Sequence, residues 1–125
     1  MTFTNNEIEV LQVLLDAKRP LTCAGIIEHS PNKTWKNRSI HLLINALLEK
    51  NVVEEAGFVR TGKTFGRAFA VSKEGQKAYL KEAIDFAGKV DTTELMSAVF
   101  AEKEIDIETI NKLEKIIAKR RGELQ

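Results

Sequence analysis

The chain has 125 residues, which is enough for one domain or for a small domain with an accessory segment. Hydrophobic residues make up 43% of the sequence and charged residues 30%, a globular balance that excludes an intrinsically disordered chain. The formal net charge of +1 identifies no partner by bulk electrostatics.

Two short helices are expected at the start of the chain. Thr4 and Glu7 have the spacing of a capping box, with Thr4 as the N-cap. The first helix should end near Ala17, because Pro20 disfavours a helical conformation in the residue before it. Thr22 should cap a second, short helix over "CAGIIEHS", and Pro31 closes that helix.

Residues 34–51, "TWKNRSIHLLINALLEKN", predict a third helix with two different faces. Its buried stripe follows the i, i+3, i+4, i+7, i+8 spacing and consists of Ile40, Leu43, Ile44, Leu47 and Leu48. Successive residues are about 100° apart, so the opposite side carries Arg38, Leu42, Asn45 and Glu49, with His41 beside them. This second face is not needed for the core, so we expect it to contact a partner.

The periodicity then changes to that of a β-hairpin. "VVEEAGFVR" and "RAFAVS" are rich in β-branched and aromatic residues, and they flank "TGKTFG", whose two glycines can supply positive φ. The tip of the hairpin is basic and carries Arg60, Lys63 and Arg67. Three short helices followed by a two-stranded hairpin is the element order of a winged helix-turn-helix.

The remaining residues predict helices again. Ser72 should cap a helix that ends near Gly88, Asp91 and Glu94 form another capping box, and a last helix runs from about Asp106 to Arg121. The apolar residues of these last two helices that we predict for dimerisation are Leu95, Val99, Phe100, Ile107, Ile110, Leu113 and Ile117.

About 50 residues are too few for a good core of their own, so this apolar stripe is buried elsewhere. It can pack on the first domain or on a second copy of the chain, and we favour the second copy, because paired small helices gain most by closing a twofold dimer. The fold class is therefore mainly α, an α+β winged helix-turn-helix over residues 1–72 with a helical dimerisation region over residues 73–125.

Basic residues are concentrated in two windows of the first part. Residues 1–72 have a net charge of +2 and residues 73–125 a net charge of −1. Residues 33–41 and 57–71 contain no acidic residue. Such windows suit a phosphate-facing surface, although they are also common on any solvated surface.

The sequence gives little support for a metal site, a phosphate-binding loop or a catalytic site. Cys23, His29 and His41 lack the paired spacing of metal ligands, so a buried free cysteine and two surface histidines are the better interpretation. "GKT" at residues 62–64 lacks the first glycine of a phosphate-binding loop. We expect no enzyme, no metal and no cofactor. Trp35 can stack on a base, but its position before a helix favours packing into the core.

The sequence also bears on location. The N-terminus "MTFTNNEIEV" lacks the basic and apolar regions of a signal peptide, and no stretch approaches the ~20 apolar residues of a membrane helix. A single cysteine cannot form an internal disulfide. We expect a cytoplasmic protein with no membrane partner.

These residues resemble a known family. "NNEIEVLQVLLDAKRPLTCAGIIEHS", "TWKNRSIHLLINALLEKNVV", "FAVSKEGQKAYL" and "LMSAVFAEKEIDIETINKLEKII" are similar to the penicillinase and methicillin-resistance repressor family (BlaI/MecI) and its copper-responsive relatives (CopY). The resemblance covers nearly the whole chain. It implies a homodimeric winged-helix repressor that binds a palindromic operator and is released by proteolysis near its C-terminal helices or by copper.

The resemblance also places site residues. The family's recognition-helix lysine falls on Arg38, its threonine on Ser39 and the following arginine on His41, while a later arginine is Ala46 here. The implied DNA-binding residues are Lys36, Asn37, Arg38, Ser39, His41, Leu42, Asn45, Arg60, Lys63 and Arg67.

The departures bear on release from DNA. The chain has no cysteine after Cys23, which excludes copper sensing by a C-terminal cysteine motif. The Asn-Phe pair cut in protease-relieved members is Val99-Phe100 here, a possible cleavage site that lacks the asparagine. The inducer or sensor protease is not identifiable from the chain.

The sequence therefore predicts a repressor that binds double-stranded DNA as a homodimer. Two alternatives stay open at this stage: a winged-helix protein-interaction module that does not bind DNA, and a ligand-sensing regulator. Leu42 and the weak basic surface favour the first alternative, whereas no charged cluster suggests a ligand for the second.

Overall fold

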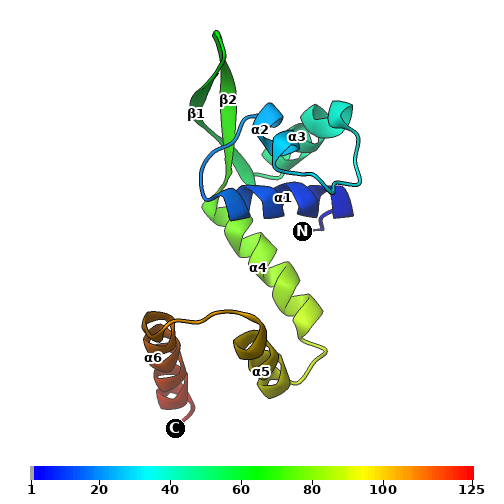
Figure 1. Cartoon of the computed structure of the whole chain (residues 1–125). Coiled ribbons are helices and arrows are strands. Elements are labelled where there is room, and N and C mark those ends of the chain that lie inside the picture. Colours follow the sequence, from blue (N-terminus) through cyan, green and yellow to red (C-terminus); the bar gives the residue numbers. More distant parts are fainter. Residues whose placement is uncertain (1) are drawn as a thin grey trace. The chain divides into compact units, whose positions relative to one another are not determined.

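The computed structural model describes residues 2–125, which form two compact units (Figure 1). The first unit ends at Ala83, the second runs from Ile84 to Gln125, and helix α4 belongs partly to each. In chain order the elements are α1 (Asn5–Ala17), α2 (Cys23–Glu28), the 3-10 turn η1 (Asn37–Ser39), α3 (Ile40–Glu49), β1 (Val53–Thr61), β2 (Thr64–Val71), α4 (Lys73–Ala87), α5 (Thr92–Glu102) and α6 (Ile107–Leu124). The predicted fold class, a mainly α chain with a winged helix-turn-helix, is confirmed.

The helix starts follow the predicted side-chain caps. The Thr4 hydroxyl accepts a hydrogen bond from the Glu7 amide, and the Glu7 carboxylate accepts one from the Thr4 amide, which completes the capping box. Thr22 and Ser72 accept from the amides of Gly25 and Gly75 in the same way. Asp91 and Asp106 cap α5 and α6. These local bonds explain why the predicted starts agree closely with the observed ones.

The core of the first unit lies where α1, α2, α3 and the base of the hairpin meet. Its fully buried side chains include Val10 and Leu11 of α1, Ile26 of α2, and Ile44 and Leu47 of α3. Trp35 is also buried, so its predicted packing into the core is confirmed. Leu21 exchanges two backbone hydrogen bonds with Phe69 of β2, which joins the loop before α2 to the edge of the hairpin.

The hairpin is longer than the sequence predicts. Its strands reach Thr61 and Thr64, so the turn has two residues, Gly62 and Lys63, in place of the expected loop over residues 61–66. Gly62 has φ +64°, as expected for such a turn, but the second positive φ belongs to Gly57. Gly57 lies where the register shifts by one residue, which is a β-bulge.

Gly66 is therefore part of β2 for a steric reason. A Cβ added there would lie 3.1 Å from Cγ2 of Thr22. The glycine lets this strand approach the start of α2 closely, so the expectation that both glycines of "TGKTFG" adopt positive φ is wrong for Gly66.

The first turn of α4 contacts the backbone that follows α3. The Ser72 amide donates to the Val52 carbonyl oxygen, and the Ser72 hydroxyl donates to the Asn51 carbonyl oxygen. A Cβ added at Gly75 would lie 2.0 Å from the Val52 carbonyl oxygen. Only glycine fits at this position unless the backbone shifts.

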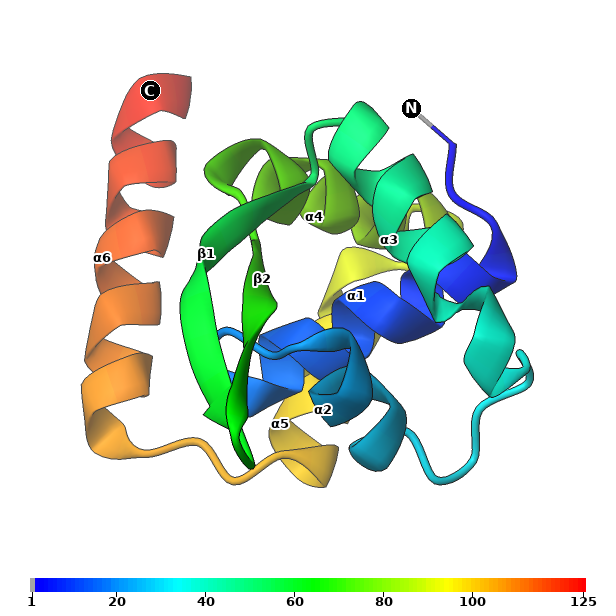
Figure 2. The same cartoon turned by 90° about the horizontal axis from the view of Figure 1, so that it is seen from above.

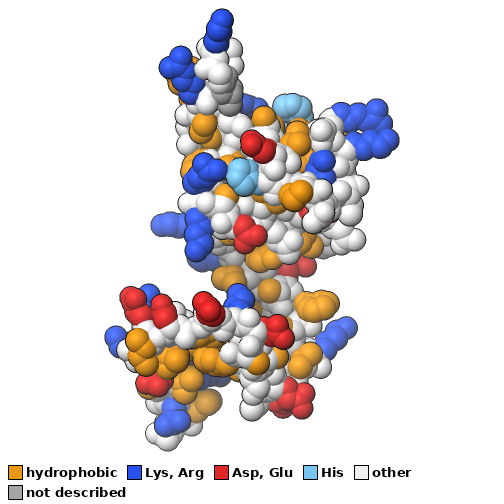
Figure 3. Space-filling view, viewed as in Figure 1, with side chains coloured by type: hydrophobic (Ala, Val, Ile, Leu, Met, Phe, Trp, Pro, Cys, Tyr) orange, Lys and Arg blue, Asp and Glu red, His pale blue; other side chains and the backbone are white. Residues whose placement is uncertain are grey.

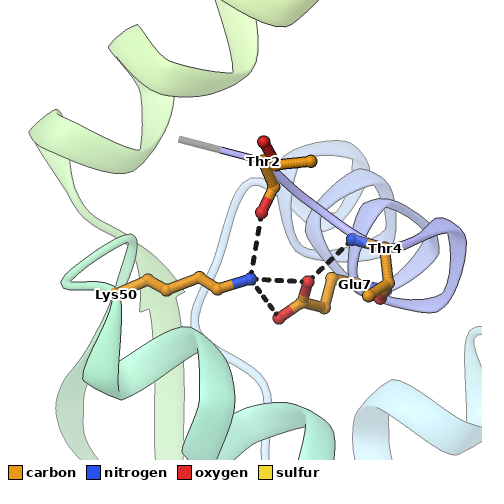
Figure 4. Close-up of polar contacts among 4 residues, drawn as sticks. All are labelled: Thr2, Thr4, Glu7 and Lys50. Carbon is orange, nitrogen blue, oxygen red and sulfur yellow. Dashed lines mark hydrogen bonds and ion pairs between the residues drawn. The ribbon is translucent and has the colours of Figure 1, made fainter.

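A partly buried ion pair ties the start of α1 to the end of α3 (Figure 4). The Lys50 ammonium lies 2.8 and 2.9 Å from the two oxygens of the Glu7 carboxylate, and it donates to the Thr2 carbonyl oxygen at 3.1 Å. The same ammonium lies 5.5 Å from the centre of the Phe3 ring. The Glu7 carboxylate, the Thr2 carbonyl and the Phe3 ring therefore converge on one side chain at the end of α3.

The pair also shifts the acidity of Glu7. Burial of this carboxyl group, which is 3% exposed, acts to raise its pKa. The hydrogen bonds from Lys50 and Thr4 outweigh burial, so the pKa of Glu7 lies below its ordinary value of 4.5. The folded state consequently favours the ionised carboxylate.

The contact at Gly75 makes a prediction about stability. Gly75→Ala should lower the free energy of unfolding of the first unit by about 2 kcal/mol or more, because the new methyl group overlaps the backbone of Val52. Urea denaturation followed by the fluorescence of Trp35, the single tryptophan, measures this unit. Gly122→Ala is the matched control, since a Cβ there meets nothing within 4 Å. Equal unfolding midpoints for the two variants would contradict the steric argument.

The ion pair makes a prediction about pH. Lys50→Met should cost roughly 1.5–3 kcal/mol near neutral pH, because it leaves the buried Glu7 carboxylate without its charged partner. In the parent protein, the stability that Glu7 contributes is present above its ordinary pKa and is lost as the pH falls through the lowered pKa. In the variant, the Lys50 ammonium no longer opposes the effect of burial on Glu7, so burial favours the protonated form of the Glu7 carboxyl group.

The stability gap between parent and Lys50→Met should therefore narrow as the pH is lowered from about 6 to about 3. Urea midpoints at several pH values measure it, with Lys77→Met, an exposed change on α4, as the control. A gap that is constant across this pH range would show that Glu7 is not the group responsible.

Candidate nucleic-acid interface

The outward face of α3 is built by burial of its other side. Ile40, Ile44 and Leu47 are buried, and Leu43 and Leu48 are half-buried against the same core. The opposite face is exposed to solvent and carries His41, Leu42, Asn45 and Glu49. Leu42 has 74% of its surface exposed, so it supports nothing in the core of the first unit.

The residues before α3 are arranged differently from the prediction of one continuous helix. Asn37, Arg38 and Ser39 form a 3-10 turn, and the α-helix starts only at Ile40. Neither Lys36 nor Ser39 makes a side-chain cap at these two starts. Lys36, Asn37 and Arg38 are exposed, and Ser39 is half-buried. A tighter turn re-aims Arg38, because a 3-10 turn has three residues per turn and an α-helix has 3.6.

His41 is directed toward α2. Its Nδ1 atom lies 3.8 Å from the Sγ atom of Cys23. Burial raises the pKa of the Cys23 thiol, although the nearby Arg67 charge acts in the opposite direction, so this half-buried cysteine is held as a neutral thiol. His29 lies elsewhere, with its Nδ1 atom 2.8 Å from the Gly25 carbonyl oxygen. Among the described residues, no group of three His, Cys, Asp or Glu side chains could hold a metal ion.

The hairpin, or wing, extends past α2 and α3 (Figure 1), and the view from above shows it beside α2 (Figure 2). Lys63 is exposed in its two-residue turn, and Arg60 donates from Nε to the Gly62 carbonyl oxygen at 3.2 Å. Basic side chains mark the wing tip in the space-filling view (Figure 3). These two cations are available to a partner.

Arg67 is held differently from Arg60 and Lys63. Its guanidinium forms an ion pair with Glu55 across the two strands and lies 5.3 Å from the centre of the Phe69 ring. Pairing with a carboxylate reduces the positive charge that this side chain offers to a phosphate. The predicted interface did not include this partner, although the acidic pair Glu54 and Glu55 in the first strand was a visible signal.

Two aromatic side chains of the wing were also absent from the predicted interface. Phe58 and Phe65 are 70% and 66% exposed on the strands that carry the basic residues. The sequence contained a signal in the acid-free window over residues 57–71, where aromatic and basic residues alternate. The prediction used only the basic ones.

The residues predicted for dimerisation lie on α5 and α6. Leu95, Val99, Ile110 and Leu113 are half-buried. Phe100, Ile107 and Ile117 are exposed, and so are Ile116 and Leu124, which the prediction did not include. Ile116, Ile117 and Leu124 line a shallow apolar depression on α6 together with Arg120 and Arg121. We call these exposed residues of α5 and α6 the C-terminal apolar face.

The possible cleavage pair, Val99 and Phe100, lies inside α5, three residues or fewer from its last residue, Glu102. A protease that binds its substrate in an extended form would need this last turn to unwind. No helix in the described part of the chain is long and apolar enough to span a membrane.

Comparison with known proteins gives one family and several structures. Residues 3–119 match the sequence profile described as penicillinase repressor. RosR of H. salinarum is 16% identical, with a TM-score of 0.53, and the match covers 96% of this chain and 94% of that chain. The adhesin competence repressor of Streptococcus pyogenes is 10% identical, with a TM-score of 0.52, and the match covers 98% and 81% of the two chains.

A mutant of S. aureus MepR is 16% identical, with a TM-score of 0.52, and covers the same shares of the two chains. At these identities the structures support the winged-helix fold alone. No curated protein matches the chain.

Proposed function

Because the chain belongs to the penicillinase repressor family, a family of DNA-binding transcription regulators, we propose that it represses transcription by binding a palindromic operator as a homodimer. One observation carries the DNA-binding part of this proposal. A helix whose inner side is fully occupied by the core presents an exposed, acid-poor outer side, next to a protruding hairpin with two available cations. That combination fits a recognition helix in the major groove and a wing beside it.

The roles on α3 follow from position and chemistry. Arg38 is exposed at the start of the helix, where a guanidinium can make two hydrogen bonds to the edge of a guanine. Asn45, Ser39 and His41 serve as secondary contacts. Leu42 projects an apolar side chain from the same face, which suits the methyl group of a thymine.

The residues around α3 and on the wing position the protein on the phosphates. Lys36 and Asn37 precede the recognition helix and are exposed. Arg60 and Lys63 reach the flanking DNA, whereas Arg67 contributes less because Glu55 already pairs with it. Contacts of this kind give affinity and orientation but carry little sequence information.

The homodimer is supported by the C-terminal apolar face. Exposed side chains such as Ile107, Ile117 and Leu124 stabilise the protein only when another surface covers them and removes them from water. A second copy provides the same residues, as a twofold interface requires. The two linked winged helices then bind two half-sites. Once the first winged helix is bound, the linkage raises the effective concentration of the second winged helix at its half-site. Release from DNA follows from any event that separates the copies.

Arg38 and Lys63 should differ in what they contribute. Arg38→Ala should weaken binding to the operator by about 1–3 kcal/mol and relax the base preference at one position, if the guanidinium contacts a guanine edge. Lys63→Ala should weaken binding to operator and random duplexes alike and reduce the slope of log Kd against log salt by about one unit. Fluorescence anisotropy with a duplex selected from a random pool measures both variants.

The control for this pair is Lys77→Met, an exposed lysine on α4, which should leave the Kd unchanged. Equal losses on selected and random duplexes for Arg38→Ala would reassign Arg38 to the phosphates. A parent protein that binds no duplex at low salt would contradict the proposed function.

The dimer should depend on residues after about Asp91. A fragment that ends at Val99 should keep a folded winged helix, sediment as a monomer and bind the operator at least about tenfold more weakly, because it lacks α6 and the last turn of α5. In the full chain, Ile110→Asp with Ile117→Asp should have the same effect. Lys115→Asp, on the opposite side of α6, is the matched control and should stay dimeric. A fragment or double variant that sediments as a dimer at micromolar concentration would refute this assignment.

A further inference from the structure

The outer half of the wing has one face on which aromatic and basic side chains alternate. In the strand register, Phe58 lies opposite Arg67, and Arg60 lies opposite Phe65. Side chains that are cross-strand partners project from the same face, as do residues two apart on one strand. Phe58, Arg60, Phe65 and Arg67 therefore form two adjacent rows, which we call the wing ladder. Phe65 and Arg60 make up the row nearer the turn.

The two phenylalanines of the wing ladder do not pack into the core of the first unit. Gly66, between Phe65 and Arg67, belongs to the other face of the strand, and that face approaches Thr22 at the start of α2. Arg67 lies over the ring of Phe69 and close enough to Cys23 for its charge to act on that thiol, so among the four ladder residues this one is turned toward the body. Both phenylalanines stay more than 60% exposed, in contrast to Phe69 at the base of the same strand, which is 1% exposed. Two large apolar side chains at a protruding tip contribute little to the stability of the wing itself.

The charged residues around Phe58 and Phe65 indicate what kind of partner surface these phenylalanines contact. Residues 57–71 contain no acidic residue, and Arg60 and Lys63 are both exposed there. A second protein surface would have to be acidic to match them. The minor groove of DNA offers the required combination, because phosphates line its two rims, its walls are the apolar edges of deoxyribose, and its floor presents acceptors at A·T pairs.

On the premise of the proposed function, we infer that the wing enters the minor groove beside the recognition site and that Phe58 and Phe65 act there as an apolar wedge that bends the DNA. The tip of the wing is narrow, because Gly62 and Lys63 close it with a two-residue turn, and it can therefore enter the groove first. Phe65 meets the groove first, and Phe58 follows one row behind, about 6–7 Å along the strand. Apolar side chains that enter the minor groove partly unstack a base step and kink the duplex toward the major groove.

The experiment uses the full-length protein and a duplex of about 30 base pairs that the parent selects from a random pool, labelled at both ends for energy transfer. The test variant is Phe58→Ala with Phe65→Ala. Val59→Ala is the matched control, because Val59 is an exposed apolar residue on the same strand but on the opposite face. Circular dichroism and sedimentation confirm that each variant is folded and has the parent's oligomeric state.

The wedge predicts a bend of about 20–90° with the parent and with Val59→Ala, and its loss with the double variant. The affinity of the double variant should fall about tenfold, while the dependence of Kd on salt stays as in the parent, because Arg60 and Lys63 still meet the phosphates. Bending and affinity that match the parent would overturn the inference. An equal loss with Val59→Ala, or a loss accompanied by a change in oligomeric state, would overturn it as well.

A second measurement locates the groove. Flanking A·T pairs replaced by inosine·cytosine pairs keep a minor groove without the guanine amino group, whereas G·C pairs introduce it. The parent should bind and bend the inosine duplex as it does the A·T duplex and should bind the G·C duplex more weakly. Equal binding to all three duplexes would contradict the minor-groove wedge but would leave the proposed function standing. A parent that selects no duplex contradicts the proposed function, and the inference with it.

Discussion

The burial of one side of α3 is the constraint on which the rest of the molecule depends. Ile40, Ile44 and Leu47 occupy the core between α1, α2 and the base of the hairpin, and each is almost completely removed from water. Full burial of such side chains contributes about 1.5–3 kcal/mol each, so rotation of the helix about its axis is strongly opposed. Leu42 and Asn45 face outward because their neighbours on α3 face inward. The orientation of the candidate DNA surface is thus a consequence of hydrophobic packing.

The Glu7–Lys50 pair complements this packing at the end of α3. Hydrophobic burial fixes which face of the helix is inward, while the directed bonds to Glu7 and to the Thr2 carbonyl fix the position of Lys50, the residue that follows the helix. The same carboxylate completes the cap of α1. Removing one partner would therefore disturb two helix ends and the N-terminal segment together, because a buried charge without a partner is costly. Positioning of this kind matters for a surface that must match the spacing of base pairs.

The wing combines rigidity at its base with exposure at its tip. Leu21 and Phe69 exchange backbone bonds, and Ala68 and Phe69 are buried, so the base is part of the core. Beyond the bulge at Gly57 the strands extend from the body, although Gly66 still lies close to Thr22, and the exposed Glu55–Arg67 ion pair joins the two strands beside the bulge. An ion pair between exposed side chains contributes little to stability. Phe58, Phe65 and Lys63 are exposed in this part of the wing and can contact a partner, whereas Arg67 is already engaged.

The sequence alone determined the features that depend on local spacing. The cap at Thr4, the apolar stripe of α3, the change of period at the hairpin and the family resemblance all follow from residues close together in the chain, and the structure and the family match confirm them. The DNA-contacting and dimerisation residues remain predictions, although the structure places most of them on exposed surfaces.

Only the tertiary structure decided which side chains are already engaged and which are left over. Glu7 and Lys50 are 43 residues apart, Cys23 and His41 are 18 apart, and Glu55 and Arg67 are 12 apart. No local pattern encodes such pairs, because they form only when separate elements pack. The extra residue at the bulge likewise sets the register that places Phe58 opposite Arg67 and Arg60 opposite Phe65. Side-chain alternation in a strand has a period of two, so a shift of one residue decides which face carries the phenylalanines.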